Sequence, residues 1–68
     1  METITLKIPN INCGHCVMTV KREGGLVQGV EYVSGDAQGK TATFKVENGQ
    51  ALAELKAALT EAGYAPEG

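Results

Sequence analysis

Apolar side chains recur at every second position in two stretches of the chain. Residues 2–8 and residues 40–46 both alternate in this way, which is typical of strands with one buried face. Residues 30–33 are β-branched and aromatic, and residues 34–39 after them have the composition of a turn. The pattern therefore predicts three strands, the last two joined as a hairpin.

Two other stretches have the spacing of helices. The first is expected over residues 14–23, or with a frayed turn to residue 27, because two glycines weaken its end. The second is expected over residues 50–62, where leucines recur at helical spacing in an alanine-rich sequence. Asn48 is a suitable N-cap for this helix, and Gly63 stands where a C-terminal stop is expected.

A short last strand at residues 64–66 completes the order β-α-β-β-α-β, the split βαβ arrangement. The predicted class is α+β, with a four-stranded antiparallel sheet and two helices on one of its faces. Residues 1–68 are expected to form a single domain, since 68 residues leave no room for two cores. The side chains expected in the core are Ile4, Leu6, Val20, Val33, Phe44, Leu52, Leu55 and Leu59.

Composition and charge exclude several classes of function. The chain has 6 Lys and Arg against 8 Asp and Glu, a formal net charge of −2, which argues against a nucleic-acid-binding protein. A membrane span needs about 20 consecutive apolar residues, and every apolar run in the chain is much shorter. The first residues also lack the layout of a signal peptide. The expected location is therefore the cytoplasm. Because the chain is too small for a deep substrate cleft, we also expect that it is not an enzyme.

Cys13 and Cys16 are the reactive side chains that have no place in the expected core. A disulfide between residues three apart closes almost no loop, and two cysteines do not complete a structural zinc site of about four ligands. At the start of a helix, this spacing puts both side chains on one face with Cβ atoms about 5–6 Å apart. The positive end of the helix stabilises thiolates, and soft thiolates select Cu(I), with Zn(II) and other soft ions as competitors. We therefore predict an exposed site for one soft metal ion, foremost Cu(I), that is suited to metal transfer.

This motif resembles that of the heavy-metal-associated (HMA) domain family, in particular its small bacterial copper chaperones. The family motif Gly-Met-x-Cys-x-x-Cys corresponds to Asn-Ile-Asn-Cys-Gly-His-Cys at residues 10–16. The resemblance covers essentially the whole chain and continues at Val17, Val20, Lys21, Gly29, Val30, Ala62, Gly63 and Tyr64. It implies a ferredoxin-like fold, Cu(I) held by both motif cysteines, and delivery to a partner, commonly the metal-binding domain of a copper-transporting P-type ATPase.

Three positions depart from the family pattern. Asn10 replaces the motif Gly, and Asn tolerates unusual backbone angles better than most residues. Ile11 replaces the motif Met, whose role in the family is to pin the loop into the core. Gly24 stands where relatives usually have a large apolar residue, which predicts a loss of local stability. Metal transfer is expected to need a mobile loop over residues 10–16, with backbone freedom from Asn10 and Gly14.

The remaining candidate residues surround the cysteines. His15 is expected to be an exposed residue that tunes the thiolate charge, rather than a ligand. The resemblance places Tyr64 close to the metal loop, where it covers the ion. The candidate docking residues are Met18, Lys21 and Arg22, since the two cations would steer an acidic partner toward the site.

Two alternative functions stay open at this point. Cys-Gly-His-Cys also occurs in thiol–disulfide redox proteins, but Asn12 stands where those proteins have an aromatic residue. The other alternative is an HMA module for Zn, Hg or Cd. We expect a monomer, and the sequence leaves open whether the metal bridges two copies into a dimer.

Overall fold

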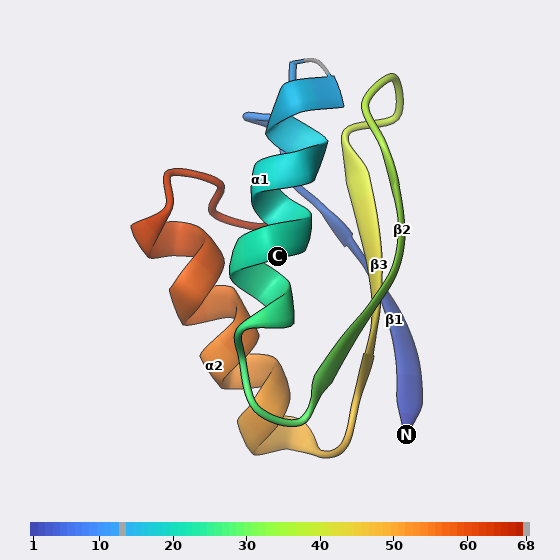
Figure 1. Cartoon of the computed structure of the whole chain (residues 1–68), viewed down its shortest axis with the longest axis vertical. Coiled ribbons are helices and arrows are strands. Elements are labelled where there is room, and N and C mark those ends of the chain that lie inside the picture. Colours follow the sequence, from blue (N-terminus) through green and yellow to red (C-terminus); the bar gives the residue numbers. More distant parts are fainter. Residues whose placement is uncertain (13, 68) are drawn as a thin grey trace.

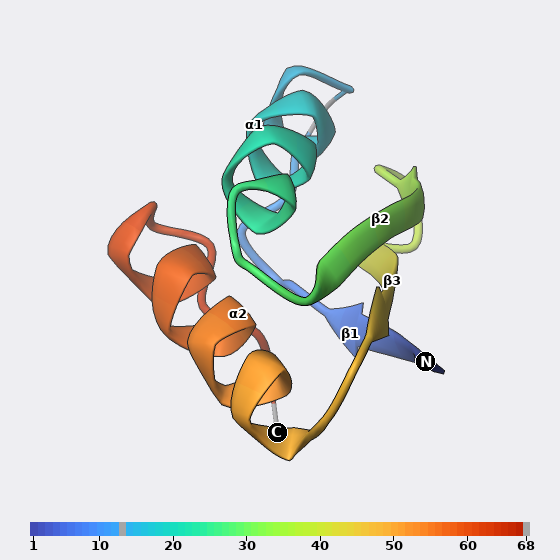
Figure 2. The ribbon, with the colours of Figure 1, turned by 60° about the horizontal axis from the view of Figure 1, so that its bottom comes forward.

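The computed structural model describes residues 1–12 and 14–67. The elements follow the order β1 (Glu2–Lys7), α1 (Gly14–Gly25), β2 (Val30–Asp36), β3 (Thr41–Val46) and α2 (Gly49–Glu61). Both helices lie on the same face of the sheet (Figures 1 and 2). The fold is therefore α+β, as the sequence predicts.

The sheet has three antiparallel strands in the order β1-β3-β2. The prediction of a fourth strand is wrong: within the described residues, the segment after α2 adds only a single bridge, between Lys7 and Glu67. The backbone N–H of Glu67 donates to the carbonyl of Lys7 at 2.7 Å. The next hydrogen-bonded pair in that register would set Ala65 opposite Pro9, and proline has no N–H to donate. The ladder beside β1 is interrupted there.

Strand β2 continues for longer than the sequence predicts. Residues 34–36, predicted as part of a turn, belong to the strand, and the turn itself covers residues 37–40. The pairing with β3 shifts between Tyr32 and Ser34, and the side chain of Val33 is 46% exposed. The prediction that Val33 lies in the core is therefore wrong. Tyr32 is the residue that turns inward, and its ring meets that of Phe44 edge to face at 5.6 Å between centroids.

Hydrogen bonds cap helix α2 at both ends. At its start, the side-chain oxygen of Asn48 accepts the N–H of Ala51 at 2.9 Å, so the predicted N-cap is confirmed. At its end, Gly63 has φ +90° and the N–H of Tyr64 donates to the carbonyl of Leu59 at 2.8 Å. These bonds form a Schellman turn, which only a residue that tolerates positive φ closes without strain.

One cluster of buried side chains fills the space between the sheet and the helices. Its members are Leu6, Ile8, Ile11, Val20, Ala42, Phe44, Val46, Ala51, Leu55 and Leu59. Ile4 and Leu52, predicted in the core, are partly buried at its edge.

Gly24 is buried at the point where α1 comes nearest to this core. A Cβ atom there would lie 2.5 Å from Cε1 of Phe44 and 3.2 Å from Cδ1 of Leu55. The Phe44 ring from β3 therefore occupies the volume into which a side chain at residue 24 would extend. Glycine in a helix costs about 1 kcal/mol relative to alanine. At residue 24 the absence of a side chain also lets the Phe44 ring pack closely against α1.

Candidate functional site

Cys16 lies in the first turn of α1, where it is half-buried and packs against the core cluster. The other predicted ligand, Cys13, lies outside the described residues. The structure thus positions one of the two thiols, at the end of α1 that carries the positive end of the helix dipole. The geometry of the pair stays a prediction.

The chain that leads to the motif is firmly held. The side chains of Ile8 and Ile11 are completely buried. The N–H of Ile8 donates to the carbonyl of Lys40 at 2.7 Å, and the N–H of Ile11 donates to the carbonyl of Ile8 at 3.1 Å. Complete burial is what pinning the loop requires of Ile11, and an isoleucine meets that requirement in place of methionine.

Asn10 does not use the backbone freedom that the sequence suggested. Among the residues that the structure describes, Lys40 is the only non-glycine residue with positive φ. Instead, the side-chain amide of Asn10 donates to the carbonyl of Gly63 at 2.7 Å. Asn10 therefore has an ordinary backbone conformation, and its side chain joins the beginning of the loop to the turn that follows α2.

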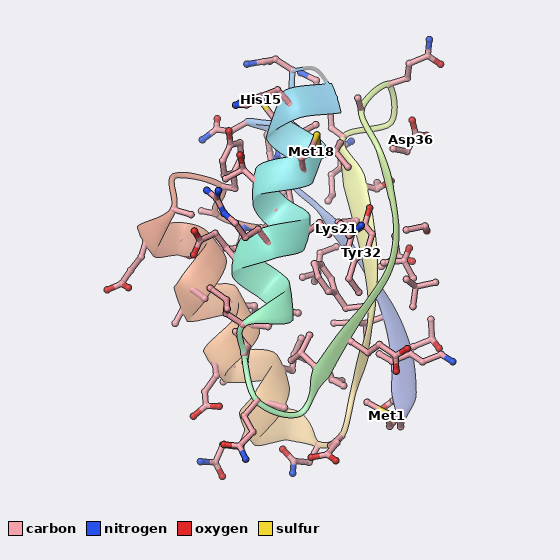
Figure 3. The ribbon with its side chains drawn as sticks, in the orientation of Figure 1. Met1, His15, Met18, Lys21, Tyr32 and Asp36 are labelled. Carbon is pink, nitrogen blue, oxygen red and sulfur yellow. The ribbon has the colours of Figure 1, made fainter. Side chains whose placement is uncertain are left out.

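Tyr64 and His15 belong to different parts of the fold. Tyr64 follows Gly63 in the Schellman turn and packs, partly buried, against the core. The fold therefore brings Tyr64 near the Asn10 side of the loop. His15 is exposed in the first turn of α1, at the same end as Met18 (Figure 3). Its carbonyl accepts the hydroxyl of Thr19 at 3.2 Å.

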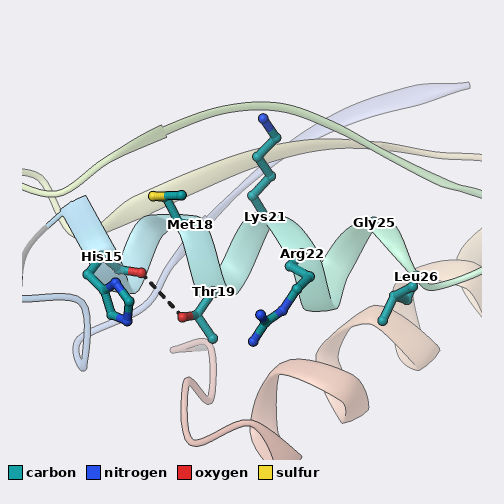
Figure 4. Close-up of a pocket in the computed structure, with 7 residues that line it drawn as sticks. All are labelled: His15, Met18, Thr19, Lys21, Arg22, Gly25 and Leu26. Carbon is teal, nitrogen blue, oxygen red and sulfur yellow. Dashed lines mark hydrogen bonds between the residues drawn. The ribbon is translucent and has the colours of Figure 1, made fainter.

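An open depression of about 590 Å³ runs along the outer side of α1 (Figure 4). Its lining residues are His15, Met18, Thr19, Lys21, Arg22, Gly25 and Leu26. Met18 and Leu26 are 67% and 77% exposed, and the two cations, Lys21 and Arg22, lie between them along the helix. The sequence analysis missed Leu26. The signal that would have found it is the spacing of four that puts Met18, Arg22 and Leu26 on one ridge of a helix.

The two cations of this surface point in different directions. Lys21 is directed toward the strands, with its Nζ 5.7 Å from the centre of the Tyr32 ring, whereas Arg22 is directed toward α2 (Figure 4). The Arg22 side chain is 73% exposed, with its Nε 3.9 Å from Oε1 of Glu23. Burial raises the pKa of Tyr32, so this phenol stays neutral beside Lys21 well into the alkaline range.

Other metal donors do not gather within residues 1–12 and 14–67. In that part of the chain, no three His, Cys, Asp or Glu side chains are close enough together to hold a metal ion. Neither of the two described helices has the length and hydropathy needed to cross a membrane.

The family model of the Heavy-metal-associated domain matches residues 5–65 of the chain. The chain belongs to the heavy-metal-associated domain family. The family prediction made from residues 10–16 and the surrounding sequence is thereby confirmed.

Three relatives of known identity are similar to this HMA protein over most of their length. The COP-associated protein of Helicobacter pylori (strain J99) is 27% identical over 60 residues, which cover 88% of this chain and 91% of that protein. The crystal structure of oxidized MerP from Ralstonia metallidurans CH34 has a TM-score of 0.87 and 28% identity, covering 97% of this chain and 93% of that one. The copper chaperone Atx1 from Synechocystis PCC6803, in a trimeric form, has a TM-score of 0.77 and 26% identity, covering 94% and 98%.

Proposed function

We propose that this HMA protein is a metallochaperone that binds Cu(I) through Cys13 and Cys16 and passes it to the thiols of a partner. The observation that carries the proposal is the half-buried Cys16 in the first turn of α1, beside an open surface, in a member of a metal-associated family. Two similar proteins bear names that refer to copper or to COP, which supports copper over other soft ions.

The transfer that we propose needs no free ion. Each thiol loses its proton to water when it becomes a ligand, and the copper stays Cu(I) throughout. An incoming thiolate adds a third sulfur before one of the original bonds breaks. The buried side chains of Ile8 and Ile11 anchor the chain before Cys13, and Cys16 stands half-buried in the first turn of α1.

We propose the surface along α1 as the face that meets the partner. Met18 and Leu26 supply apolar contact area, and Lys21 and Arg22 add positive charge to a chain whose net charge is −2. This combination suits an acidic acceptor, such as the metal-binding domain of a copper-transporting P-type ATPase, because opposite charges raise the rate of encounter. The chain would act in the cytoplasm as one domain over residues 1–68, without catalysis.

Anaerobic competition tests the metal assignment. Cu(I) and Zn(II) are titrated separately against chelators of known affinity, with wild-type protein and with Cys13→Ser and Cys16→Ser. We expect tight Cu(I) binding by the wild type, a loss of more than about 100-fold in each variant because one of two ligands is gone, and an unchanged circular dichroism spectrum. Tighter retention of Zn(II) than of Cu(I) at equal free concentration would reject copper as the cargo.

The same samples separate the rival functions. Coupled reduction of insulin disulfides by the metal-free protein would indicate the thiol–disulfide redox function. Preferential retention of Hg(II) or Cd(II) over Cu(I) would indicate the other HMA module. Light scattering with and without Cu(I) distinguishes a monomer from a metal-bridged dimer.

A further inference from the structure

The hydrogen bond from Asn10 to Gly63 joins two segments that are 53 residues apart in the chain. Its acceptor is well fixed, because the N–H of Gly63 donates to the carbonyl of Thr60 at 3.1 Å and the next N–H donates to Leu59. Since these bonds belong to the Schellman turn, the Gly63 carbonyl has a defined direction.

The donor of this bond is fixed as well. Asn10 stands between Ile8 and Ile11, whose side chains are both completely buried, and the backbone of these two isoleucines is joined by a hydrogen bond of 3.1 Å. The side-chain amide is therefore presented to Gly63 from a rigid segment. Glycine, the residue of the family motif at this position, has no side chain that could make the bond.

We propose that Asn10 is a positioning residue that slows metal exchange by holding the Gly63–Tyr64 turn against the stretch leading to Cys13. The inference rests on the proposed function. With the bond in place, the Gly63–Tyr64 turn is joined to residue 10 and Tyr64 stays packed on the core, and in this proposal that arrangement narrows the approach to the motif. When the bond opens, the turn moves away from the loop, and a competing thiol or chelator reaches the ion more often.

The size of the effect follows from the strength of one exposed, neutral hydrogen bond. Such a bond shifts an equilibrium between closed and open forms by about two- to tenfold. Because the bond acts on access and touches no ligand, we expect faster exchange with an unchanged affinity for Cu(I).

Asn10→Ala and Asn10→Gly test this role together. Both remove the amide and differ in backbone freedom, so a shared effect is attributable to the lost bond. Thr60→Ala is the matched control, because the Thr60 hydroxyl also makes one exposed bond to a backbone carbonyl, that of Lys56 at 2.8 Å, but within α2.

Stopped-flow transfer of Cu(I) from each loaded protein to excess bicinchoninate gives the first readout. We expect both Asn10 variants to release Cu(I) about two to ten times faster than wild type and Thr60→Ala to match wild type. Equilibrium affinity should stay within about twofold, whereas general loosening of the fold would weaken it. Wild-type rates in both Asn10 variants, or equal acceleration in Thr60→Ala, would overturn the proposal.

The second readout uses metal-free protein and is independent of copper. Iodoacetamide alkylation of Cys16, followed by mass spectrometry, and hydrogen exchange of the Tyr64 amide should both accelerate in the two Asn10 variants. If wild type does not bind Cu(I) but both rates rise, the proposed function fails while the positioning role stands. If neither rate changes, the positioning role is refuted whatever the metal.

Discussion

The two helices cover the same face of the sheet but are built in different ways. α2 consists mainly of alanine and leucine, which favour helices, and hydrogen bonds from Asn48 and around Gly63 complete its two ends. α1 contains three β-branched residues and ends in two glycines, so its own sequence favours a helix much less. α1 therefore depends on tertiary packing, whereas α2 is largely specified by local sequence.

The two helices also differ in their relation to the candidate site. α1 carries Cys16 at its first turn and the exposed Met18 and Arg22 along its outer side. α2 contributes no residue to that surface, but the turn that follows it binds Asn10. The helix with the poorer intrinsic stability thus carries the candidate site, and the better-formed helix anchors the loop before it.

The packing of α1 is tested most strongly at Gly24. In Gly24→Leu the new side chain meets the Phe44 ring and Leu55, and overpacking of a dense core costs about 1–3 kcal/mol. We expect the free energy of unfolding, measured by urea titration, to fall by that amount, even though leucine is the better helix former. A gain in stability would instead show that the Phe44 ring moves easily to make room for the new side chain.

Gly25→Leu is the matched control for that change. A Cβ at Gly25 meets no atom within 4 Å, so the substitution changes helix propensity without crowding the core. We expect unchanged or slightly higher stability, since replacing glycine within a helix gains up to about 1 kcal/mol. Equal destabilisation by both substitutions would mean that the end of α1 rejects any side chain, for reasons other than Phe44.

Local signals explain what the sequence predicts well. α2 was expected over residues 50–62 and extends over Gly49–Glu61, because both its cap residues act within one turn of the helix. The start of α1 and the position of Cys16 in its first turn follow likewise from local spacing. For the same reason the family was identifiable from the motif at residues 10–16.

The failures all involve pairs of distant segments. Val33 is predicted in the core, but the contact of Tyr32 with Phe44 across β2 and β3 turns Tyr32 inward, and strand alternation then turns Val33 outward. The fourth strand was expected from residues 64–66 alone, whereas its extent depends on Pro9 across the sheet. The bond between Asn10 and Gly63 spans 53 residues, so no sequence pattern signals it.

The outer side of α1 gives the second test, which concerns transfer rate rather than stability. In a Lys21→Glu/Arg22→Glu double variant, attraction to an acidic acceptor becomes repulsion. We expect Cu(I) delivery to the acidic metal-binding domain of a copper-transporting ATPase to slow by about tenfold or more at low salt, with little change in Cu(I) affinity. Stopped-flow transfer measures the rate, and added salt should reduce the difference from wild type.

A charge-matched variant controls for this test. Lys7→Glu/Lys45→Glu makes the same change in net charge at exposed positions of β1 and β3, away from the depression along α1. Its transfer rate should stay much closer to that of wild type. An equal slowing in both double variants would mean that overall charge, and no particular face, governs the encounter.

The smallest expected effect concerns Tyr32, which packs between the sheet and α1. Burial raises its pKa above the ordinary value of 10.0, so the folded protein favours the neutral phenol. This contribution is complete below pH 10 and is lost as the pH rises through the raised pKa, because the unfolded chain ionises first. We expect stability to urea to fall as the pH rises above 10 in wild type and to fall less in Tyr32→Phe. Tyr64→Phe serves as the comparison, and an identical decline in wild type and Tyr32→Phe would remove Tyr32 as the cause. Hydrogen exchange over the same range should accelerate in α1 before α2, because the Tyr32 ring supports the helix that depends on packing.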